Sequence, residues 1–365
     1  MNILHLEASP GWGGQEIRIL REAEGMRLRG HTVILVVMNG GGLVAEACKA
    51  GFTIYEIDYH KSAWPIAFWR LMRIMRRHRV DLVNTHSSLD SWIGGLAARM
   101  LRIPIVRTRH LSTPIKSGIN SRLLYGALAD FVVTTCSSIL PMISVQSRKP
   151  LTSMRCIATG VDAQRMQFSQ EDVQAFRSSL NLSGSDFLIG TACFMRSWKG
   201  INDLLEAANR LRGEAHLKWV IIGGGHQEAY RKRAAELKLE GIVHFTGHLA
   251  NPIFALQALD VFTLLSTAHE GISQAILQAA YLGKPLIATP VGGSSEICLD
   301  GQTGILVPPF SPEKTAAAAL RLMHDPEGRI RMGSQARERI LRYYTLQHML
   351  DQMEEVYCRI VPNHL

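Results

Sequence analysis

Two cationic side chains, Arg196 and Lys199, follow a short apolar segment typical of a β-strand, residues 187–190, and precede a helical pattern. Ligands bind open α/β sheets beyond the carboxyl ends of the strands, and Arg and Lys are side chains that bind phosphate oxygens. Because the two cations are three residues apart, they share one loop. The pair indicates a diphosphate site, and an ordinary pair of surface cations is the alternative.

An acidic residue, Glu270, follows a second apolar segment at residues 261–264 and precedes Gly271 and a helical pattern. The first amides of a helix have no partner inside the helix and carry a partial positive charge, so they can bind phosphate or hydroxyl oxygens. Gln278 lies in the same helical segment, eight residues after Glu270. This block predicts a second part of the same kind of site, with the first backbone amides of the helix as hydrogen-bond donors.

Two glycine-rich loops also join a strand pattern to a helical pattern, one with Gly13 and Gly14 and the other with Gly223 and Gly224. A glycine backbone can approach a phosphate or a sugar closely, and the following helix presents free N–H groups. The first loop lacks the G-x-G-x-x-G spacing of nicotinamide-binding proteins. For both loops, a tight turn without a binding role is the alternative.

The elements that would position these residues alternate between strand and helix. Such alternation indicates parallel sheets covered by helices on both faces. For 365 residues we expect two doubly wound, Rossmann-like α/β domains that face a cleft, 1–168 and 169–344, and a C-terminal helix within 345–365 that packs back on the first domain. The predicted strands are 2–6, 33–37, 53–57, 80–84, 104–108, 131–134, 155–158, 187–190, 217–222, 243–245, 261–264, 285–288 and 304–307.

Charge is distributed unevenly along the chain. The net charge is +9, and residues 1–168 hold 21 Lys and Arg against 11 Asp and Glu, so the excess lies in the first domain. This asymmetry indicates an anionic partner: nucleic acid, an acidic membrane surface or a phosphorylated substrate. Residues 64–79 combine Trp and Phe with five arginines at helical spacing, as in helices that bind anionic lipid. The alternative is an amphipathic helix that covers the sheet. Because this pattern is confined to one helix, we do not expect nucleic-acid binding.

Cysteine usage and hydropathy narrow the class of protein further. The six cysteines show no C-x-x-C spacing, and the chain has no charged-then-apolar leader. Apolar runs are shorter than the roughly 18 residues that span a bilayer, and the H-E-x-x-H pattern of zinc hydrolases is missing. We therefore expect a cytoplasmic protein that needs no metal, and neither an integral membrane protein nor a zinc enzyme.

Taken together, the motifs resemble those of retaining glycosyltransferases of family four, which have the GT-B fold. The resemblance extends over nearly the whole chain. It implies that the C-terminal domain binds a nucleotide-sugar donor, that the N-terminal domain shapes the acceptor site, and that transfer occurs in the cleft. It rests on the first glycine loop and on residues 29–33, 199–200, 270–271 with the following helix, 283–285, 291–296 and 300–304.

The resemblance also assigns roles in the donor domain. Glu270 matches the first of a pair of glutamates and would lie near the donor sugar, and Lys199 would neutralise the diphosphate. Arg196 would join Lys199, although members of the family commonly carry an arginine where this chain has Phe194. Gln278 replaces the second glutamate, which typically binds ribose hydroxyls. Further donor-binding positions are the amides at 272–275, Gly13, Gly14, Gly223, Gly224, Gly271 and His248.

In the N-terminal domain, His110 matches a histidine at the end of a strand that approaches the transferred sugar, and His86 matches a second position in the cleft. Trp12 and Arg109 are the other expected acceptor-binding residues.

The function that follows is transfer of a sugar, with retention, from a nucleotide-sugar to a glycan or lipid-linked acceptor. We expect that acceptor to belong to lipopolysaccharide core, O-antigen or exopolysaccharide assembly, on the inner face of the membrane. The leaving phosphate oxygen is expected to act as the base, without a cofactor or a metal. Two alternatives stay open: a non-catalytic nucleotide-sugar-binding partner subunit, motivated by Gln278, and a nucleotide-sugar epimerase.

Overall fold

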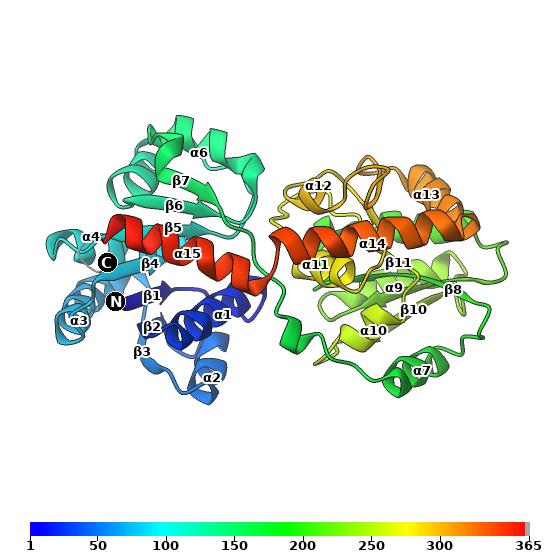
Figure 1. Cartoon of the computed structure of the whole chain (residues 1–365), viewed down its shortest axis with the longest axis horizontal. Helices are drawn as coiled ribbons and strands as arrows, with labels where there is room; N and C mark the ends of the chain where they lie inside the picture. Colours follow the sequence, from blue (N-terminus) through cyan, green and yellow to red (C-terminus); the bar gives the residue numbers. More distant parts are fainter. Residues whose placement is uncertain (362–365) are drawn as a thin grey trace. The chain divides into compact units, whose positions relative to one another are not determined.

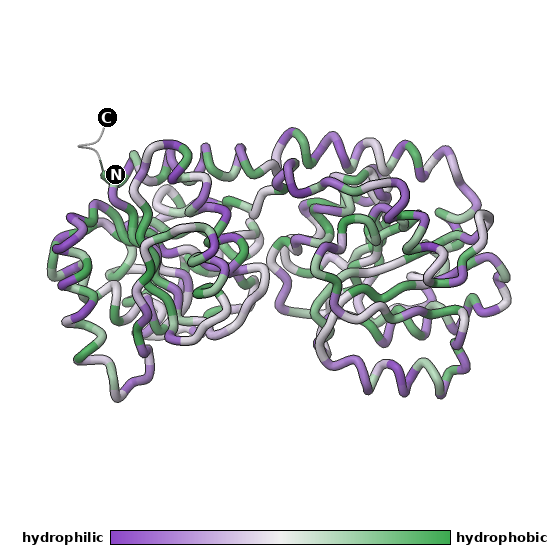
Figure 2. Tube along the Cα trace, turned by 90° about the horizontal axis from the view of Figure 1, so that it is seen from below, coloured by the Kyte–Doolittle hydropathy of each residue, from purple (hydrophilic) through white to green (hydrophobic). Residues whose placement is uncertain are grey.

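The computed structural model describes residues 1–361, and these form two compact units. Unit 1 comprises residues 1–159 together with the segment that starts at Leu346, and unit 2 comprises residues 160–345. Each unit is a parallel β-sheet with helices on both faces (Figure 1). In Figure 2 the tube through the inner strands is mostly green, for hydrophobic residues, whereas the outer helices alternate between green and purple.

Unit 1 contains a seven-stranded sheet in the order β3-β2-β1-β4-β5-β6-β7, with every pair parallel. The strands are β1 (Asn2–Glu7), β2 (Thr32–Met38), β3 (Thr53–Ile57), β4 (Leu82–Thr85), β5 (Ile105–Arg109), β6 (Phe131–Thr134) and β7 (Met154–Cys156). The helices are α1 (Gly14–Leu28), α2 (Gly42–Lys49), α3 (Trp64–Arg77), α4 (Ser88–Met100), α5 (Ile119–Ser121), α6 (Leu140–Ser147) and α15 (Leu346–Ile360).

The strands of unit 1 are apolar on both sides, because helices cover both faces of the sheet. Ile3 and Leu35 pack into the core beneath α1 and α15, whereas Leu4 and Leu6 pack into the core beneath α3 and α4. In α15 the buried side chains include Met353.

Unit 2 contains a six-stranded parallel sheet in the order β10-β9-β8-β11-β12-β13. The strands are β8 (Phe187–Ala192), β9 (Leu217–Ile222), β10 (Val243–Gly247), β11 (Val261–Leu264), β12 (Leu286–Ala288) and β13 (Gly304–Leu306). The helices are α7 (Gln170–Ser179), α8 (Ile201–Arg210), α9 (Gln227–Glu236), α10 (Ile253–Gln257), α11 (Gln274–Tyr281), α12 (Ser294–Ile297), α13 (Pro312–His324) and α14 (Pro326–Tyr343). This is the predicted fold class, a pair of doubly wound α/β domains.

The boundary between the units lies between residues 159 and 160, earlier in the chain than the predicted position after 168. The reason is a contact between distant parts of the chain: the Val161 N–H donates a hydrogen bond to the Tyr344 carbonyl, and Val161 forms a β-bridge with Thr345. These contacts join residues 160–168 to the end of unit 2. The chain then returns to unit 1, where the Arg29 guanidinium of α1 forms ion pairs with α15.

Among the helices within residues 1–361, none combines the length and the apolar composition that crossing a bilayer requires.

Candidate active site

The loop after β8 carries the two cations that the sequence singled out. Gly200 ends this loop with φ +68°, in the left-handed region, and a Cβ there would lie 1.9 Å from the Leu265 carbonyl oxygen. The close approach fixes the loop against the end of β11. Because the carboxyl ends of the parallel strands β8 and β11 meet at one edge of the sheet, Lys199 and Glu270 become neighbours.

Lys199 and Glu270 form an ion pair. The Lys199 Nζ lies 2.7 Å from Glu270 Oε2, and the Ser266 hydroxyl donates to the same oxygen over 2.7 Å. The Glu270 residue is 5% exposed, so the ion pair and the hydroxyl satisfy a nearly buried carboxylate. The ammonium has three N–H donors, and within residues 1–361 it bonds only Glu270. Two of its donors therefore remain for an anion.

Arg196 is exposed and lies between two aromatic rings. Its guanidinium carbon is 5.4 Å from the centre of the Phe194 ring and 5.2 Å from that of Trp198. Aromatic faces attract a cation without using its N–H donors. No acidic residue within 1–361 forms an ion pair with Arg196. Phe194 thus helps to hold Arg196. Family members commonly carry an arginine at position 194 itself.

The second glycine loop, after β9, packs against the loop after β8 that carries Arg196 and Lys199. Gly223 has φ +128°, and a Cβ on it would lie 2.0 Å from the Cys193 carbonyl oxygen. The neighbouring Gly224 accepts a hydrogen bond from the Met195 N–H, and its α-carbon faces His248. Close packing of the backbone therefore explains Gly223, and Gly224 and His248 lie together beside the Arg196 loop.

The block after Glu270 leads into α11, as predicted. The N-cap residue of this helix is Ser273, whose hydroxyl does not cap it, and Gly271 is held through its carbonyl, which accepts the Gly293 N–H over 3.1 Å. Gln278 is half-buried, and its side chain forms no hydrogen bond with any of residues 1–361. Its amide is therefore available to a ligand. Of the other predicted donor positions of this block, Gln274 and Ala275 begin the first turn of α11, and Ile272 precedes the N-cap.

In unit 1 the predicted histidines His86 and His110 are joined in one chain, which also contains His5. His86 Nδ1 lies 3.0 Å from His110 Nε2, and His86 Nε2 lies 2.9 Å from His5 Nδ1. The parallel register places His5 of β1 beside Asn84 of β4, so the three rings follow neighbouring strands. Burial lowers the pKa of His5, and it lowers the pKa values of His86 and His110 well below the usual range, helped there by Arg18 and Arg107. The three rings are therefore neutral at pH 7.

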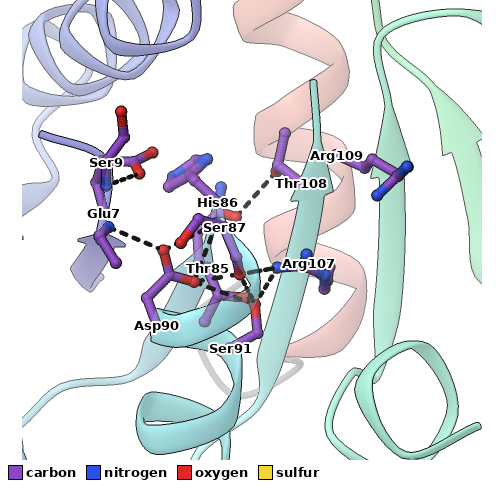
Figure 3. A network of polar contacts seen from close by, with 12 residues as sticks. Glu7, Ser9, Thr85, His86, Ser87, Asp90, Ser91, Arg107, Thr108 and Arg109 are labelled. Carbon is purple, nitrogen blue, oxygen red and sulfur yellow. Dashed lines mark hydrogen bonds and ion pairs between the residues drawn. The ribbon is translucent and has the colours of Figure 1, made fainter. Parts of the chain in front are cut away.

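Two buried carboxyl groups, Glu7 and Asp90, lie at the same edge of the sheet. Asp90 accepts the backbone N–H groups of Ala8 and Ser87 (Figure 3). Glu7 accepts the Ser9 N–H over 2.7 Å and the Gln15 amide over 2.6 Å. Burial and the charge of Asp90 raise the pKa of Glu7 to about 8, and burial raises the pKa of Asp90 to about 6. Glu7 is therefore largely protonated at neutral pH.

The remaining predicted residues of unit 1 are less directly organised for binding. The Arg109 guanidinium donates to the Tyr125 hydroxyl over 2.7 Å and to the Thr113 carbonyl, so it holds the loop after β5. In Figure 3 its side chain points away from Asp90. Trp12 is exposed, whereas Gly13 and Gly14 begin α1 without a backbone angle that requires glycine. A tight turn that requires glycine, the alternative for this loop, therefore does not explain Gly13 and Gly14.

Sequence reasoning missed His5, Glu7, Glu22 and Asp90. A signal existed for His5 and Glu7, because each is a polar residue in or at the end of an otherwise apolar strand. No comparable signal marks Glu22, whose hydrogen-bond partners Asn84 and Tyr357 come from other elements. Among residues 1–361, no group of three or more His, Cys, Asp and Glu side chains is arranged to hold a metal ion.

Comparison with known proteins agrees with the geometry. A family model described as Glycosyltransferase Family 4 matches residues 12–165, and one described as Glycosyl transferases group 1 matches residues 172–339. The N-acetyl-alpha-D-glucosaminyl L-malate synthase of Bacillus anthracis is 25% identical over 296 residues, which are 79% of this chain and 77% of that enzyme. The O-antigen chain mannosyltransferase C of Escherichia coli is 30% identical over 211 residues, 56% of this chain and 54% of that one.

The fold is also that of solved glycosyltransferases. The crystal structure of HepE from Anabaena, in complex with UDP, superimposes with a TM-score of 0.87 over 98% of this chain and 100% of that one, at 21% identity. The two family models match successive parts of the chain that correspond to its two sheets. The chain therefore belongs to glycosyltransferase family four and has the GT-B fold.

Proposed function

We propose that this glycosyltransferase transfers a sugar from a nucleoside-diphosphate sugar to a glycan or lipid-linked acceptor, with retention at the anomeric carbon. Unit 2 binds the donor. The observation that carries the proposal is the ion pair of Lys199 and Glu270: within residues 1–361 the Lys199 ammonium bonds only Glu270, and Arg196, in the same loop, has no acidic partner. The UDP bound to HepE, a protein of the same fold, supports a nucleotide ligand.

The proposed reaction requires stabilisation of the charge that develops as the bond between the sugar and the phosphate breaks. As the bond between the sugar and the phosphate breaks, negative charge gathers on the departing diphosphate, and cations that are already in place stabilise it without reorganisation. Lys199 and Arg196 supply these cations. Glu270, held by Ser266, lies beside them and faces the positive charge that develops on the sugar. For attack on the same face, the leaving phosphate oxygen takes the proton of the acceptor hydroxyl, so the reaction needs neither a metal nor a cofactor.

The donor site is tested by calorimetric titration with UDP, GDP, ADP and CMP, each with magnesium and with EDTA. We expect one diphosphate to bind in the micromolar range without magnesium. The matching nucleotide-sugars are then offered with a lipid-linked or oligosaccharide acceptor, and the anomeric coupling of the product is read by NMR. A product with inverted configuration, or binding that requires magnesium, would contradict the proposal.

Glu270→Ala separates the transferase from the two alternatives. A transferase loses turnover in this variant while the bound nucleotide is retained, because Lys199 and Arg196 remain. A non-catalytic partner subunit shows no turnover even as the unchanged chain. An epimerase converts the nucleotide-sugar when no acceptor is present, so the unchanged chain is also incubated with donor alone.

We further propose that unit 1 associates with an anionic membrane surface through α3, which would place a lipid-linked acceptor near the enzyme. The O-antigen mannosyltransferase relative is compatible with such an acceptor. One face of α3 covers the sheet with Leu71 and Met75, as the alternative interpretation predicted. Ile66 and Trp69 are nevertheless 68% and 64% exposed, and they share the outer side with the arginines Arg70, Arg73, Arg76 and Arg77.

Apolar side chains beside arginines are the combination that inserts into an anionic interface. Flotation with vesicles that contain or lack an anionic phospholipid tests the surface. We expect binding to anionic vesicles that falls at least tenfold in an Ile66→Ser, Trp69→Ser double variant. The control is Leu28→Ser, which removes an apolar side chain that is even more exposed, at 87%, but lies on another helix. Equal binding by the double variant and the unchanged chain would exclude α3 as the membrane contact.

A further inference from the structure

Three histidines of unit 1, His5, His86 and His110, form a continuous path from the protein interior to a ring nitrogen that is open to a ligand. The rings of His5 and His86 are stacked, with centroids 5.2 Å apart and planes 6° apart, and the His86 and His110 centroids are also 5.2 Å apart. Within residues 1–361 the outer nitrogen of His110, Nδ1, bonds no side chain, and it is not among the buried unpaired atoms.

Neutral imidazole carries one N–H donor and one lone pair, so a chain of three rings has only two fully bonded arrangements. In the first, every N–H points outward, and His110 presents an N–H at Nδ1. In the second, every N–H points inward, and His110 presents a lone pair at Nδ1. The inner end of the chain therefore decides which kind of group His110 can bind at its outer end.

The inner end faces a buried carboxylate. His5 Nε2 lies 4.0 Å from Glu22 Oε1, and it has no hydrogen-bond partner among the described residues. Glu22 is 0% exposed and accepts hydrogen bonds from the Asn84 amide, over 3.3 Å, and from the Tyr357 hydroxyl. Two donors directed at one oxygen fit an ionised carboxylate, and the Arg18 guanidinium at 3.9 Å supplies the opposite charge.

A buried negative charge favours an N–H over a lone pair on the nitrogen that faces it, because the energy of a wrongly directed dipole is large where water is excluded. Of the charged groups near the chain, Glu22 is the one that acts on His5, whereas Arg18 and Arg107 act on His86 and His110. The carboxylate thus selects the inward arrangement, with the proton of each ring on Nε2.

We propose that Glu22 is a positioning residue that acts through His5 and His86 to fix His110 in the Nε2–H tautomer, so that Nδ1 accepts a hydrogen bond from a ligand hydroxyl. A neutral ring in this state cannot bind a phosphate oxygen at Nδ1, because both atoms are acceptors. That the hydroxyl belongs to a sugar rests on the proposed function. The tautomer does not.

The tautomer is measured directly by long-range ¹H–¹⁵N NMR of protein with ¹⁵N-labelled histidine, in which a protonated and a bare ring nitrogen have well-separated shifts. His110→Gln assigns the signal of His110. We expect Nδ1 of His110 to be bare and Nε2 to be protonated in the unchanged chain at pH 7. A protonated Nδ1 would overturn the inference without any further variant.

Two variants test the path. His5→Phe keeps the shape of the buried ring and removes the acceptor for His86 Nε2–H. The proton of His86 should then move to its own Nδ1. As a result, His110 should switch to the Nδ1–H tautomer. Glu22→Gln should give a mixture of both tautomers. The matched control is Tyr357→Phe, which removes a donor to Glu22 and keeps the charge, and it should leave the His110 signal unchanged. An unchanged tautomer in His5→Phe would also overturn the inference.

Activity is scored separately, so the two ideas can fail independently. If the tautomer is as expected and no sugar is transferred, the proposed function fails alone. If the enzyme is active and the tautomer is reversed, the positioning role of Glu22 fails alone. Where both hold, His5→Phe should raise the KM for the sugar ligand more than it lowers kcat.

Discussion

The two units share a strand order over six strands, but they differ in how deeply their charged side chains are buried. In unit 1, Arg18, Glu22, Asp90 and Arg107 are at most 2% exposed. In unit 2, the cations of the candidate site reach the surface, and Arg196 forms no ion pair within residues 1–361. The sheet provides the same edge in both units, and the burial of the charges decides what that edge can bind.

The difference has a simple physical basis. Buried charges must neutralise one another, since an unpaired charge inside a protein is costly. The network of unit 1 therefore presents neutral groups, such as the ring of His110, which suit hydroxyl groups. In unit 2, Arg196 is exposed, and the half-buried Lys199 uses one of its three N–H donors on Glu270, so donors remain for an anion such as a diphosphate. If the proposed function holds, we therefore expect the charged part of the substrates to bind unit 2 and the uncharged part to bind unit 1.

The largest expected effect is that of Lys199→Ala, which tests whether unit 2 is the anion site. The change removes a cation beside the diphosphate and leaves Glu270 nearly buried without its ion-pair partner. We expect kcat to fall by about 10²–10³, the loss typical of removing one preorganised stabilising group. Nucleotide binding measured by calorimetry should weaken in parallel.

Lys314→Ala is the control for this experiment, because it removes an exposed lysine of unit 2 that lies on α13. It should change neither kcat nor nucleotide affinity. If Lys199→Ala behaved like this control, the assignment of the diphosphate to unit 2 would be wrong.

The next effect concerns the backbone that holds the cations. In Gly200→Ala, both the left-handed backbone and the 1.9 Å approach to the Leu265 carbonyl oppose the new methyl group. We expect a loss of about 2–3 kcal/mol in the free energy of unfolding. Gly301→Ala separates the two causes, because Gly301 has φ +71° and open space around it; its cost should be about 1 kcal/mol. Urea unfolding of both variants gives the difference, and equal losses would exclude the close contact as a cause.

The strands and the order of the elements were predictable from the sequence because they depend on local patterns. Each apolar run gave a strand with ends shifted by a few residues, and the loop with Lys199 and the block with Glu270 lie at the predicted strand ends. These features need only the periodicity of the chain and the rule that parallel strands end at one edge.

The histidine chain and its carboxylate were not predictable in this way. His5 and His86 are 81 residues apart, and Glu22 bonds Tyr357 across 335 residues. The contact of His5 with His86 depends on the register between β1 and β4, which leaves no local pattern. The return of α15 to unit 1 was predicted, but not that it would bring Tyr357 to Glu22. The domain boundary differed for the same reason, since Val161 is held by residues near the end of unit 2.

A smaller effect tests the buried charges of unit 1 through pH. The pKa of Glu7 is raised from 4.5 to about 8, so between these values the folded state binds more protons than the unfolded state. Stability contributed by this group is therefore present at low pH and lost as pH rises through about 8. In Glu7→Gln the Gln15 amide can turn to accept a hydrogen bond, and the charge never forms.

We expect Glu7→Gln to match the unchanged chain at pH 5 and to be more stable by about 1–2 kcal/mol at pH 9, as measured by urea unfolding. The control is Glu46→Gln, on the surface of the same unit, which should give no difference that depends on pH. A variant that was less stable at pH 9 would mean that unit 1 needs the ionised carboxylate, which would weaken the contrast between the two units.

The smallest effect concerns Gln278, where unit 2 departs from its family by presenting a neutral group. Its side chain bonds none of the described residues, so Gln278→Glu should leave the fold intact. A carboxylate forms stronger hydrogen bonds to ribose hydroxyls than an amide does, and the difference of about 1 kcal/mol corresponds to an affinity about five- to tenfold higher for the nucleoside diphosphate.

Because the ribose lies outside the bond that breaks, kcat should change less than Kd. Calorimetry and steady-state kinetics on the same preparation separate the two quantities. A rise in kcat of a hundredfold or more would instead mean that the glutamine limits catalysis, and the assignment of the neutral contacts to unit 1 alone would then be wrong.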